Sequence, residues 1–344
     1  MSAAPGGSPT AARDESLGPI LVTGGNGAVG HFVIEELASL GHEIVSLSRR
    51  DADGFPSPKV RHVKADVRDL PEMVSAFDAH RVHRIIHLAA LLLECESDPH
   101  LGFEINSVGT LNVLEAARRA CVERVVFVSS KAAFGPLTGE WGYPTYRAIA
   151  EDHPLNPIGM YGLSKRTAED IASYYRKRYG MDIVTIRFGT SVGPGKGARH
   201  GASIVTSTIV ENAARGIPTT VARGGDERDD IIYNRDVAHG VVLAALKSGR
   251  VSPVYHLGSG KLIRLEDIAR AVRAVIPESQ IEIGAGLDYM GLGISNYCLM
   301  STELARDELG FAARYSVGDW VKEYIEISRA QGDARSPNGP AGRS

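Results

Sequence analysis

Short apolar runs and longer helical repeats alternate along the first half of the chain. The apolar runs have the length of buried strands and cover residues 18–23, 42–48, 60–63, 82–90, 125–129 and 181–187. Between them, apolar residues recur at helical spacing, most clearly over 28–40, 103–119 and 161–178. Apolar strands that alternate with helices predict a parallel sheet covered on both faces. We therefore expect an α/β fold, a Rossmann-type doubly wound parallel sheet with ligands at the C-terminal ends of its strands.

Beyond Gly189 the pattern becomes less regular. It predicts strands over 230–233 and 254–257, helices over 202–215, 236–247, 265–275 and 301–309, and a last helix that starts at Ser316. Ser316 and Asp319 have the spacing of a capping box. We expect these elements to form a smaller C-terminal α/β lobe that closes a substrate cleft against the sheet.

A glycine-rich turn separates the first predicted strand from the first predicted helix. It covers residues 23–30, and Gly24, Gly27 and Gly30 are spaced three residues apart. Glycines allow close backbone approach, while free N–H groups and the helix dipole attract an anion, so this arrangement suits a dinucleotide pyrophosphate. The spacing is the Gly-x-x-Gly-x-x-Gly variant that is typical of short-chain dehydrogenase/reductases.

The end of the second predicted strand bears on which dinucleotide binds. An acidic residue here usually holds the ribose 2′-hydroxyl of NAD, whereas an arginine accommodates the 2′-phosphate of NADP. This chain has Ser48, Arg49 and Arg50 at the strand end, and Asp51 comes three residues after Ser48. We therefore expect NADP to be favoured, with NAD as the alternative.

Tyr161 and Lys165 stand four residues apart in a predicted helix, so they share one helix face. A free tyrosine has a pKa of about 10 and is a poor base at neutral pH. A neighbouring ammonium favours the phenolate and lowers the pKa of the phenol, which suits Tyr161 to proton transfer. Downstream of a dinucleotide turn, this spacing predicts a catalytic pair.

The predicted organisation has four parts. An NAD(P)-binding Rossmann domain covers residues 18–188, and residues 229–260 return to it. The substrate-binding lobe consists of 189–228 and 261–330. The composition of residues 1–17 and 331–344 predicts disordered tails.

Composition narrows the class of function. The 344 residues carry a net charge of −3, which argues against a nucleic-acid or membrane-surface partner, and the longest apolar run is too short to span a bilayer. Cys95, Cys121 and Cys298 have neither metal-ligand nor disulfide spacing, so we expect a cytoplasmic protein without a bound metal. His83 and His87 would lie about 13 Å apart on a strand, too far to share one metal. The acidic run at 226–230 is typical of a charged surface turn.

The ordered set of motifs resembles the extended short-chain dehydrogenase/reductases, the NAD-dependent epimerase/dehydratase group typified by UDP-galactose 4-epimerase. The resemblance covers nearly all of 19–328. Matching segments are the glycine turn, 66–69, 87–90, 106–112, 127–130, the Tyr161/Lys165 pair, 193–195, 236–238 and 258–260.

The resemblance implies roles for individual residues. Tyr161 exchanges a proton with the substrate oxygen, Ser130 hydrogen-bonds the same oxygen, and Lys165 lowers the pKa of Tyr161 and bonds the nicotinamide ribose. Expected cofactor contacts come from Gly24, Asn26, Gly27, Ala28, Val29, Gly30, Ser48, Arg49, Asp66, Val67, Leu88, Ala89, Ala90 and Asn106, as well as from Tyr161 and Lys165. Family members often dimerise through the helices that correspond to 103–119 and 161–178, so the resemblance also implies a homodimer.

Departures from the family pattern bear on the substrate. Family dehydratases have an Asp-Glu pair where this chain has Lys131-Ala132, so dehydration is disfavoured. Nucleotide-sugar enzymes commonly hold the diphosphate with an asparagine at the position of Thr190 and an arginine at the position of Asp229. A carboxylate that faced a diphosphate would repel it. Expected substrate contacts are therefore Leu91, Lys131, Thr190, Lys196 and Arg228, with Arg199 and His200 as further phosphate candidates.

Three functions follow from these motifs. The first is an NAD(P)-dependent oxidoreductase that interconverts a secondary alcohol and a ketone on a small molecule without a nucleotide. The second is a nucleotide-sugar 4-epimerase that uses the same residues, and the third is a non-catalytic NAD(P)-binding regulator. The intact set of Ser130, Tyr161 and Lys165 argues against the regulator, and Thr190 and Asp229 favour the first function over the second.

Overall fold

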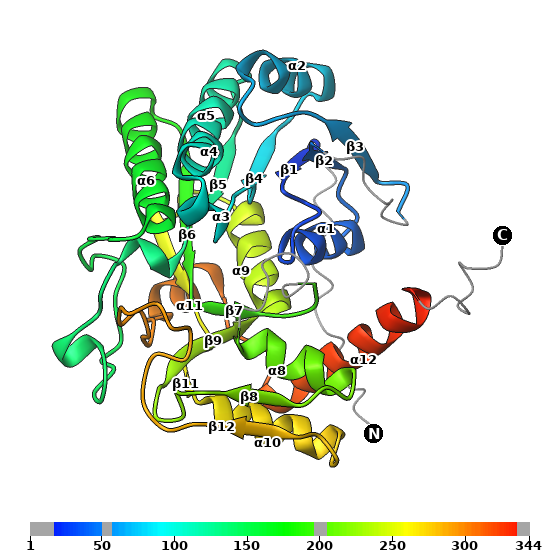
Figure 1. Ribbon diagram of the computed structural model, residues 1–344. Coiled ribbons are helices and arrows are strands. Elements are labelled where there is room, and N and C mark those ends of the chain that lie inside the picture. Colours follow the sequence, from blue (N-terminus) through cyan, green and yellow to red (C-terminus); the bar gives the residue numbers. More distant parts are fainter. Residues whose placement is uncertain (1–16, 50–56, 196–204, 336–344) are drawn as a thin grey trace, which may run out of the picture.

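A seven-stranded parallel sheet forms the centre of the computed structural model, which describes residues 17–49, 57–195 and 205–335 (Figure 1). Its strands are β1 (Ile20–Thr23), β2 (Ile44–Ser48), β3 (Val60–Lys64), β4 (Arg84–His87), β5 (Arg124–Val128), β6 (Ile183–Phe188) and β10 (Val254–Leu257). They lie in the order β10-β6-β5-β4-β1-β2-β3, with every neighbouring pair parallel. The predicted doubly wound α/β fold is confirmed.

Alternate residues of the strands face two helical layers, because successive side chains of a strand point to opposite faces. On one face, Ile20 and Val22 of β1 join the core cluster that includes α1 (Gly30–Ser39) and α9 (Asn234–Leu246). On the other face, Leu21 joins the cluster that includes α2 (Leu70–His80), α5 (Gly109–Arg119) and α6 (Met160–Tyr179). Both faces are therefore apolar, as a buried parallel sheet requires.

The helix predicted over 103–119 is not one continuous α-helix. The short helices α3 (Glu94–Ser97) and α4 (Pro99–Phe103) lead into a π-helical turn, Glu104–Val108, from which α5 continues. π-Helical turns inside helices occur frequently at functional sites. Here the turn carries Asn106 toward the segment that follows β4.

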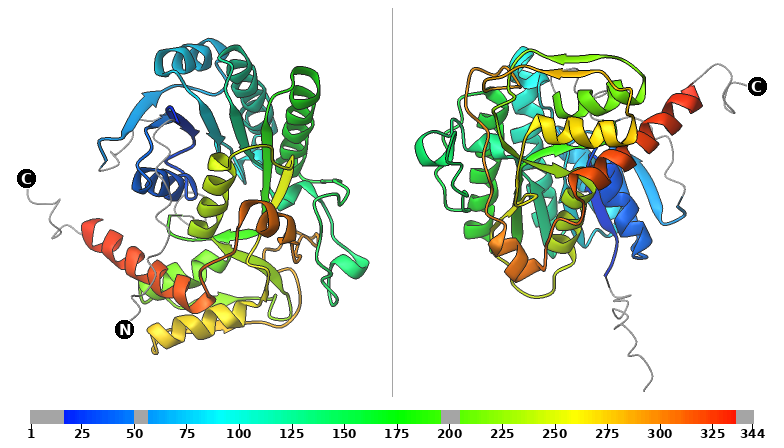
Figure 2. Two further views of the ribbon diagram at one scale, coloured as in Figure 1. Left: turned by 180° about the vertical axis from the view of Figure 1, so that it is seen from behind. Right: turned by 90° about the horizontal axis from the view of Figure 1, so that it is seen from below.

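The rest of the chain forms two small sheets with their own helices (Figures 1 and 2). A three-stranded sheet has the order β11 (Leu262–Ile263), β9 (Asp229–Tyr233), β7 (Thr190–Val192), and β12 (Ile281–Ile283) pairs with β8 (Thr219–Val221). The helices are α8 (Val205–Ala214), α10 (Leu265–Val275), α11 (Glu303–Leu309) and α12 (Val317–Arg335). A second apolar core joins α8, α10 and α12 to β7 and β9. Strands β7, β8 and β12 are short, three residues each, and the sequence pattern missed them.

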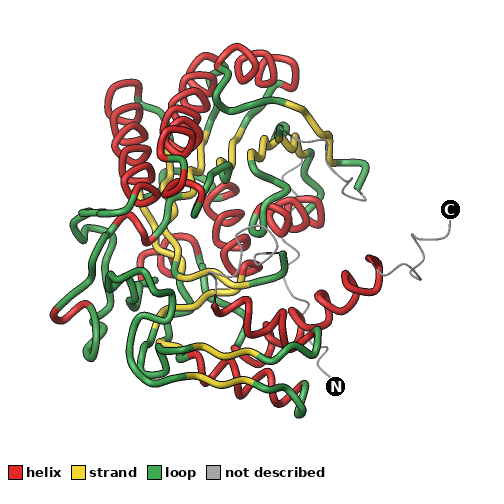
Figure 3. Tube along the Cα trace, in the orientation of Figure 1, coloured by secondary structure: helices red, strands yellow, loops and turns green. Residues whose placement is uncertain are grey.

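Two local features concern the C-terminal helix and the loop after β5. The capping box at α12 is confirmed: Ser316 Oγ accepts from Asp319 N at 3.3 Å, and Asp319 accepts from Ser316 N at 3.0 Å. The segment 129–159 is mostly loop (Figure 3), with short 3₁₀ turns at Lys131–Ala133 and Gly139–Trp141. Across residues 17–49, 57–195 and 205–335, none of the helices combines the length and apolar character needed to traverse a bilayer.

Candidate active site

The glycine turn lies where β1 ends beside β4. Gly24 has a φ of +71°, and a Cβ built on it would lie 2.8 Å from Ala89 N. A Cβ on Gly30 would lie 2.2 Å from Gly24 O, so only glycine lets α1 begin against the turn. Since the first N–H groups of a helix have no partner within it, this narrow turn fits the phosphates of a dinucleotide.

Neighbouring elements brace the turn. Asn26 Nδ2 donates to Ser48 Oγ at the end of β2 (3.3 Å), and Asn234 Nδ2 at the start of α9 donates to Ala28 O (3.4 Å). Ala28 is buried and Val29 packs against the core cluster of α1. The predicted cofactor residues of the turn and of β2 thus share one sheet edge.

A series of hydrogen bonds, each with an assignable donor and acceptor, links the ends of β1 and β4. Thr110 Oγ1 donates to Asn106 O (2.6 Å), so it accepts from His87 Nε2 at 3.1 Å. Nδ1 of His87 must then accept from Thr23 Oγ1 (2.6 Å), which in turn accepts from Ala89 N (3.2 Å). Burial, aided by the charge of Lys165, lowers the pKa of His87 to about 3, so the imidazole is neutral.

Asn106 uses its side chain entirely within the protein. Its Oδ1 accepts from Leu91 N (2.8 Å), and its Nδ2 donates to Leu91 O (2.9 Å) and to Ser164 Oγ on α6 (2.9 Å). Leu91 packs against the core cluster that includes α5. The structure therefore gives Asn106 the geometry of a brace between the loop after β4 and α6, and Leu91 is partly buried against the core.

Asp66 and Val67 follow β3, the edge strand of the large sheet beside β2. The Asp66 carboxylate accepts two bonds from Arg68 (Nε 3.0 Å, NH2 2.6 Å), and these bonds lower its pKa. Val67 is buried, and Asn112 Nδ2 donates to its carbonyl (3.0 Å). Arg49 is exposed after β2, and its charge contributes to the lowered pKa of Asp66.

Ser130, Tyr161 and Lys165 lie together at the carboxyl end of β5. Tyr161 and Lys165 occupy the first turns of α6, and Lys165 Nζ lies 5.9 Å from the Tyr161 ring centroid. Lys165 Nζ donates to the carbonyl oxygen of Val128 (2.8 Å), and this bond fixes the position of the ammonium. Val128 precedes Ser130 by two residues. Ser130 Oγ caps the 3₁₀ turn by accepting from Ala132 N (3.2 Å).

The expectation that Lys165 lowers the pKa of Tyr161 is wrong. Burial raises the pKa of Tyr161 to about 12, and the hydrogen bond with Ser130 opposes this only in part. Burial also lowers the pKa of Lys165 to about 8, against the charge of Glu169. Removing both groups from water favours their neutral forms, and at 5.9 Å from the ring the ammonium does not offset this.

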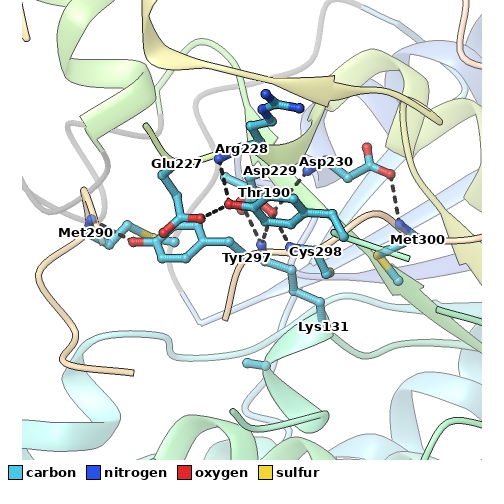
Figure 4. Close-up of polar contacts among 12 residues, drawn as sticks. Lys131, Thr190, Glu227, Arg228, Asp229, Asp230, Met290, Tyr297, Cys298 and Met300 are labelled. Atoms are coloured by element: carbon cyan, nitrogen blue, oxygen red, sulfur yellow. Dashed lines mark hydrogen bonds and ion pairs between the residues drawn. The ribbon is translucent and has the colours of Figure 1, made fainter. Parts of the chain in front are cut away.

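The cationic candidate beside Ser130 has a partner within the chain. Lys131 Nζ lies 2.6 and 2.7 Å from the two carboxylate oxygens of Asp229, and both side chains are buried (Figure 4). Thr190 Oγ1 and Tyr289 also donate to Asp229. Lys131 therefore meets a carboxylate of its own chain, and its contact with an anionic substrate group stays a prediction.

The acidic run at 226–230 is also not a surface turn, because Glu227, Asp229 and Asp230 are buried. Asp230 Oδ1 accepts from the backbone and hydroxyl of Ser259 (2.6 and 2.8 Å), while burial raises its pKa to about 6. β9 is the central strand of the three-stranded sheet and all five of its residues are buried, so neither aspartate faces solvent.

Arg228 and Lys196 are two other residues that are predicted to contact substrate. Arg228 is partly exposed, its backbone N–H donates to Tyr146 (3.2 Å), and its guanidinium points away from Lys131 (Figure 4). Lys196, like Arg199 and His200, falls outside the described residues. Within the described ranges, no group of three His, Cys, Asp or Glu side chains has the arrangement of a metal site.

The sequence analysis did not identify Glu169 and Arg187, which form an ion pair close to Lys165. Glu169 accepts from Arg187 (NH2–Oε2 2.7 Å) and from Ser129 Oγ (2.5 Å), one turn beyond Lys165 on α6. The sequence does contain a signal for Glu169, because a residue four positions after Lys165 lies on the same face of the helix. The contacts of Asp229 with Lys131 and Tyr289 had no such signal, since 98 and 60 residues separate the partners.

Comparison with known proteins agrees with this geometry. The model described as "NAD dependent epimerase/dehydratase family" matches residues 20–258. The UDP-glucose 4-epimerase of Lacticaseibacillus casei is 28% identical over 326 residues, which cover 88% of this chain and 94% of that protein. The L-arabinose 1-dehydrogenase (NAD(P)(+)) of Haloferax volcanii is 32% identical over 180 residues, or 49% of this chain and 66% of that protein.

The fold comparison points the same way. The crystal structure of UDP-glucose 4-epimerase from Thermus thermophilus in complex with NAD matches with a TM-score of 0.77 and 27% identity. The match covers 90% of this chain and 99% of that one. Because the family model spans well over half of the sequence, the chain belongs to the NAD-dependent epimerase/dehydratase family.

Proposed function

We propose that this enzyme oxidises a secondary alcohol of a sugar-type substrate by hydride transfer to NAD, and that it works as a nucleotide-sugar 4-epimerase. The observation that carries the proposal is the convergence of Ser130, Tyr161 and Lys165 at the carboxyl end of β5, two strands from the glycine turn. Ligands of open parallel sheets bind at this edge.

The protein residues handle the proton. Tyr161, through its phenolate, accepts the hydroxyl proton of the substrate, and Ser130 hydrogen-bonds the same oxygen. The pKa of Tyr161, about 12, has to fall for this step. An oxidised nicotinamide, when bound, would supply the hydride acceptor and a positive charge beside the phenol of Tyr161, and this charge would favour the phenolate. Lys165, held by Val128 O, adds the second positive charge.

We favour epimerisation over net oxidation, because one of the two arguments against a nucleotide-sugar substrate does not apply. The expected repulsion between Asp229 and a diphosphate requires that the carboxylate faces the substrate, yet it is buried and paired with Lys131. That repulsion is therefore removed. The relative that matches nearly the whole chain and the solved structure described above are both UDP-glucose 4-epimerases.

A dehydrogenase that acts on an alcohol without a nucleotide is the second candidate. It is favoured by Thr190, which stands where nucleotide-sugar enzymes commonly have an asparagine and whose hydroxyl donates to Asp229. In this candidate the same three residues act, but the ketone leaves and the reduced cofactor is released. The partial match to an L-arabinose 1-dehydrogenase is consistent with it.

We propose NAD as the cofactor in place of the expected NADP. The solved Thermus epimerase is a complex with NAD, whereas the expectation of NADP rests on the sequence alone, in which Arg49 and Arg50 follow a Ser48 that replaces the usual carboxylate. Titration of the apoenzyme with each oxidised dinucleotide tests this. Tighter binding of NADP, lost in Arg49→Asp, would contradict the proposal.

The function is tested by incubating the enzyme and NAD with UDP-galactose or UDP-glucose and following the sugar by proton NMR. Appearance of the opposite 4-epimer, with no free reduced nicotinamide, supports the proposal. Steady growth of reduced nicotinamide on a panel of secondary alcohols, with UDP-sugars unchanged, supports the dehydrogenase instead.

A further inference from the structure

We propose that Lys131 and Asp229 are positioning residues for Ser130. Their buried ion pair fixes the turn that follows Ser130 and couples this turn to the segment 289–298 of the C-terminal region. The kinetic part of this inference rests on the proposed function, whereas the structural part stands without it.

The first step is the turn itself. Ser130 Oγ accepts from Ala132 N (3.2 Å), Ser130 O accepts from Ala133 N (3.2 Å), and Lys131 O accepts from Phe134 N (3.0 Å). Lys131 is thus part of the same hydrogen-bonded turn as Ser130. Fixing the far end of the Lys131 side chain therefore restricts how this turn can rotate.

The second step is the anchor at that far end. The Asp229 carboxylate accepts from the Lys131 ammonium, from the hydroxyls of Thr190 and Tyr289, and from the backbone N–H of Asp230 and Cys298 (Figure 4). The exposed fraction of the side chain is 6% for Lys131 and 0% for Asp229, so water cannot replace either partner. Each charge is tolerated in the interior because the other is present.

The third step is the connection to 289–298. Tyr289 Oη lies 3.1 Å from Asp229 Oδ2, Cys298 N lies 3.1 Å from Asp229 Oδ1, and Lys131 Nζ lies 5.8 Å from the Tyr297 ring centroid. Three residues of one segment therefore contact a single ion pair whose other end is the turn at Ser130. Displacement of this segment would be transmitted to Ser130.

The test compares Lys131→Met with a matched control. Arg147→Met removes a cation of the neighbouring loop, whose ion pair with Glu140 has the same kind of contact (2.8 Å) but is exposed, with side chains 61% and 51% accessible. Hydrogen exchange of 131–137 and 289–298 is measured by mass spectrometry, together with NAD affinity, kcat and KM. Lys131→Arg serves as the conservative variant.

We expect Lys131→Met to accelerate exchange in both segments, and Arg147→Met to leave it unchanged. Because misplacement of a catalytic group can cost about 100-fold in rate, we expect kcat to fall by roughly tenfold to 100-fold. KM and NAD affinity should stay within about threefold, because an interaction used in the transition state affects kcat rather than ground-state binding. Lys131→Arg should restore most of kcat.

Wild-type exchange and wild-type kcat in Lys131→Met would overturn the proposal. If that variant does not fold, the double variant Lys131→Met/Asp229→Asn leaves no unpaired buried charge and is measured in its place. Wild-type kcat and wild-type exchange in the double variant would also overturn the proposal. Absence of turnover by the wild-type enzyme counts against the proposed function alone, because the exchange measurement needs no substrate.

Discussion

Glu169 on α6 and Arg187 on β6 form a buried ion pair directly behind Lys165, with Arg187 NH2 and Glu169 Oε2 2.7 Å apart. Glu169 also accepts from Ser129 Oγ (2.5 Å), so one carboxylate contacts both β6 and the residue that follows β5. Its charge raises the pKa of Lys165 against the larger effect of burial. The pair therefore supports both the position and the charge of Lys165.

Replacing Glu169 with Gln should destabilise the fold. Arg187 would keep its charge in the interior without a carboxylate partner, and breaking a buried pair in this way costs about 3–5 kcal/mol of unfolding free energy. Asp170→Asn is the matched control on the same helix, since its contact with Arg166 is exposed and 3.9 Å long. Surface pairs contribute about 0–1 kcal/mol. Equal urea midpoints for the two variants would contradict this role of Glu169.

Gly30→Ala should abolish dinucleotide binding. The added Cβ would lie 2.2 Å from Gly24 O and 2.8 Å from Gly25 Cα, both backbone atoms that cannot move without opening the turn. Gly318→Ala in α12 is the control, because its Cβ would meet only Ser316 Oγ at 3.8 Å. Isothermal titration with NAD compares the two. Wild-type affinity in Gly30→Ala would separate the turn from cofactor binding.

Two buried histidines should make the fold sensitive to acid. Burial lowers the pKa of His87 and of His256 to about 3, from an ordinary value of 6.5. Between these values the unfolded chain binds protons that the folded chain does not. Unfolding free energy is therefore fully present above pH 6.5 and falls as the pH drops toward 3, by up to about 1.4 kcal/mol per pH unit for each histidine.

Urea unfolding at a series of pH values measures this slope. His87→Gln should reduce the slope in the acid range, whatever its effect on stability at neutral pH. A variant with the slope of the wild type would show that His87 becomes protonated in the folded protein, contrary to its neutral hydrogen-bond chain with Thr23 and Thr110.

Apolar side chains on α5 and α6 suggest where two copies of the chain meet. Leu111 and Leu163 are exposed, as is Tyr174, and the family resemblance implies a dimer through these helices. We expect light scattering to give a dimer mass for the wild type and a monomer mass for Leu111→Glu/Leu163→Glu. A monomeric wild type, or a dimeric double variant, would contradict this interface.

Much of the fold and part of the site could be predicted from the sequence because the signals are local. The glycine turn and the Tyr161/Lys165 spacing each lie within one strand–turn–helix unit or one helix, and apolar runs mark the strands of the large sheet. The short strands β7, β8 and β12 carry too few residues for a pattern to stand out.

What could not be predicted depends on contacts between distant segments. The acidic run at 226–230 looked like a solvated turn, because nothing near it in the sequence shows that Lys131 and Tyr289 reach Asp229. The pKa of Tyr161 was misjudged for a related reason. Helical spacing shows that a lysine is near, but only the packed structure shows that burial has the larger effect.

The most direct test of the catalytic role of Tyr161 compares Tyr161→Phe with Tyr174→Phe. Both residues lie on α6 and both changes remove a single hydroxyl, but Tyr174 is exposed away from the candidate site. Conversion of UDP-galactose, or of whichever alcohol the substrate panel identifies, is measured with NAD affinity as a second readout. We predict that Tyr161→Phe loses about 10²-fold or more in kcat with NAD affinity nearly unchanged, while Tyr174→Phe matches the wild type. Turnover by Tyr161→Phe at the wild-type rate would remove Tyr161 from the mechanism.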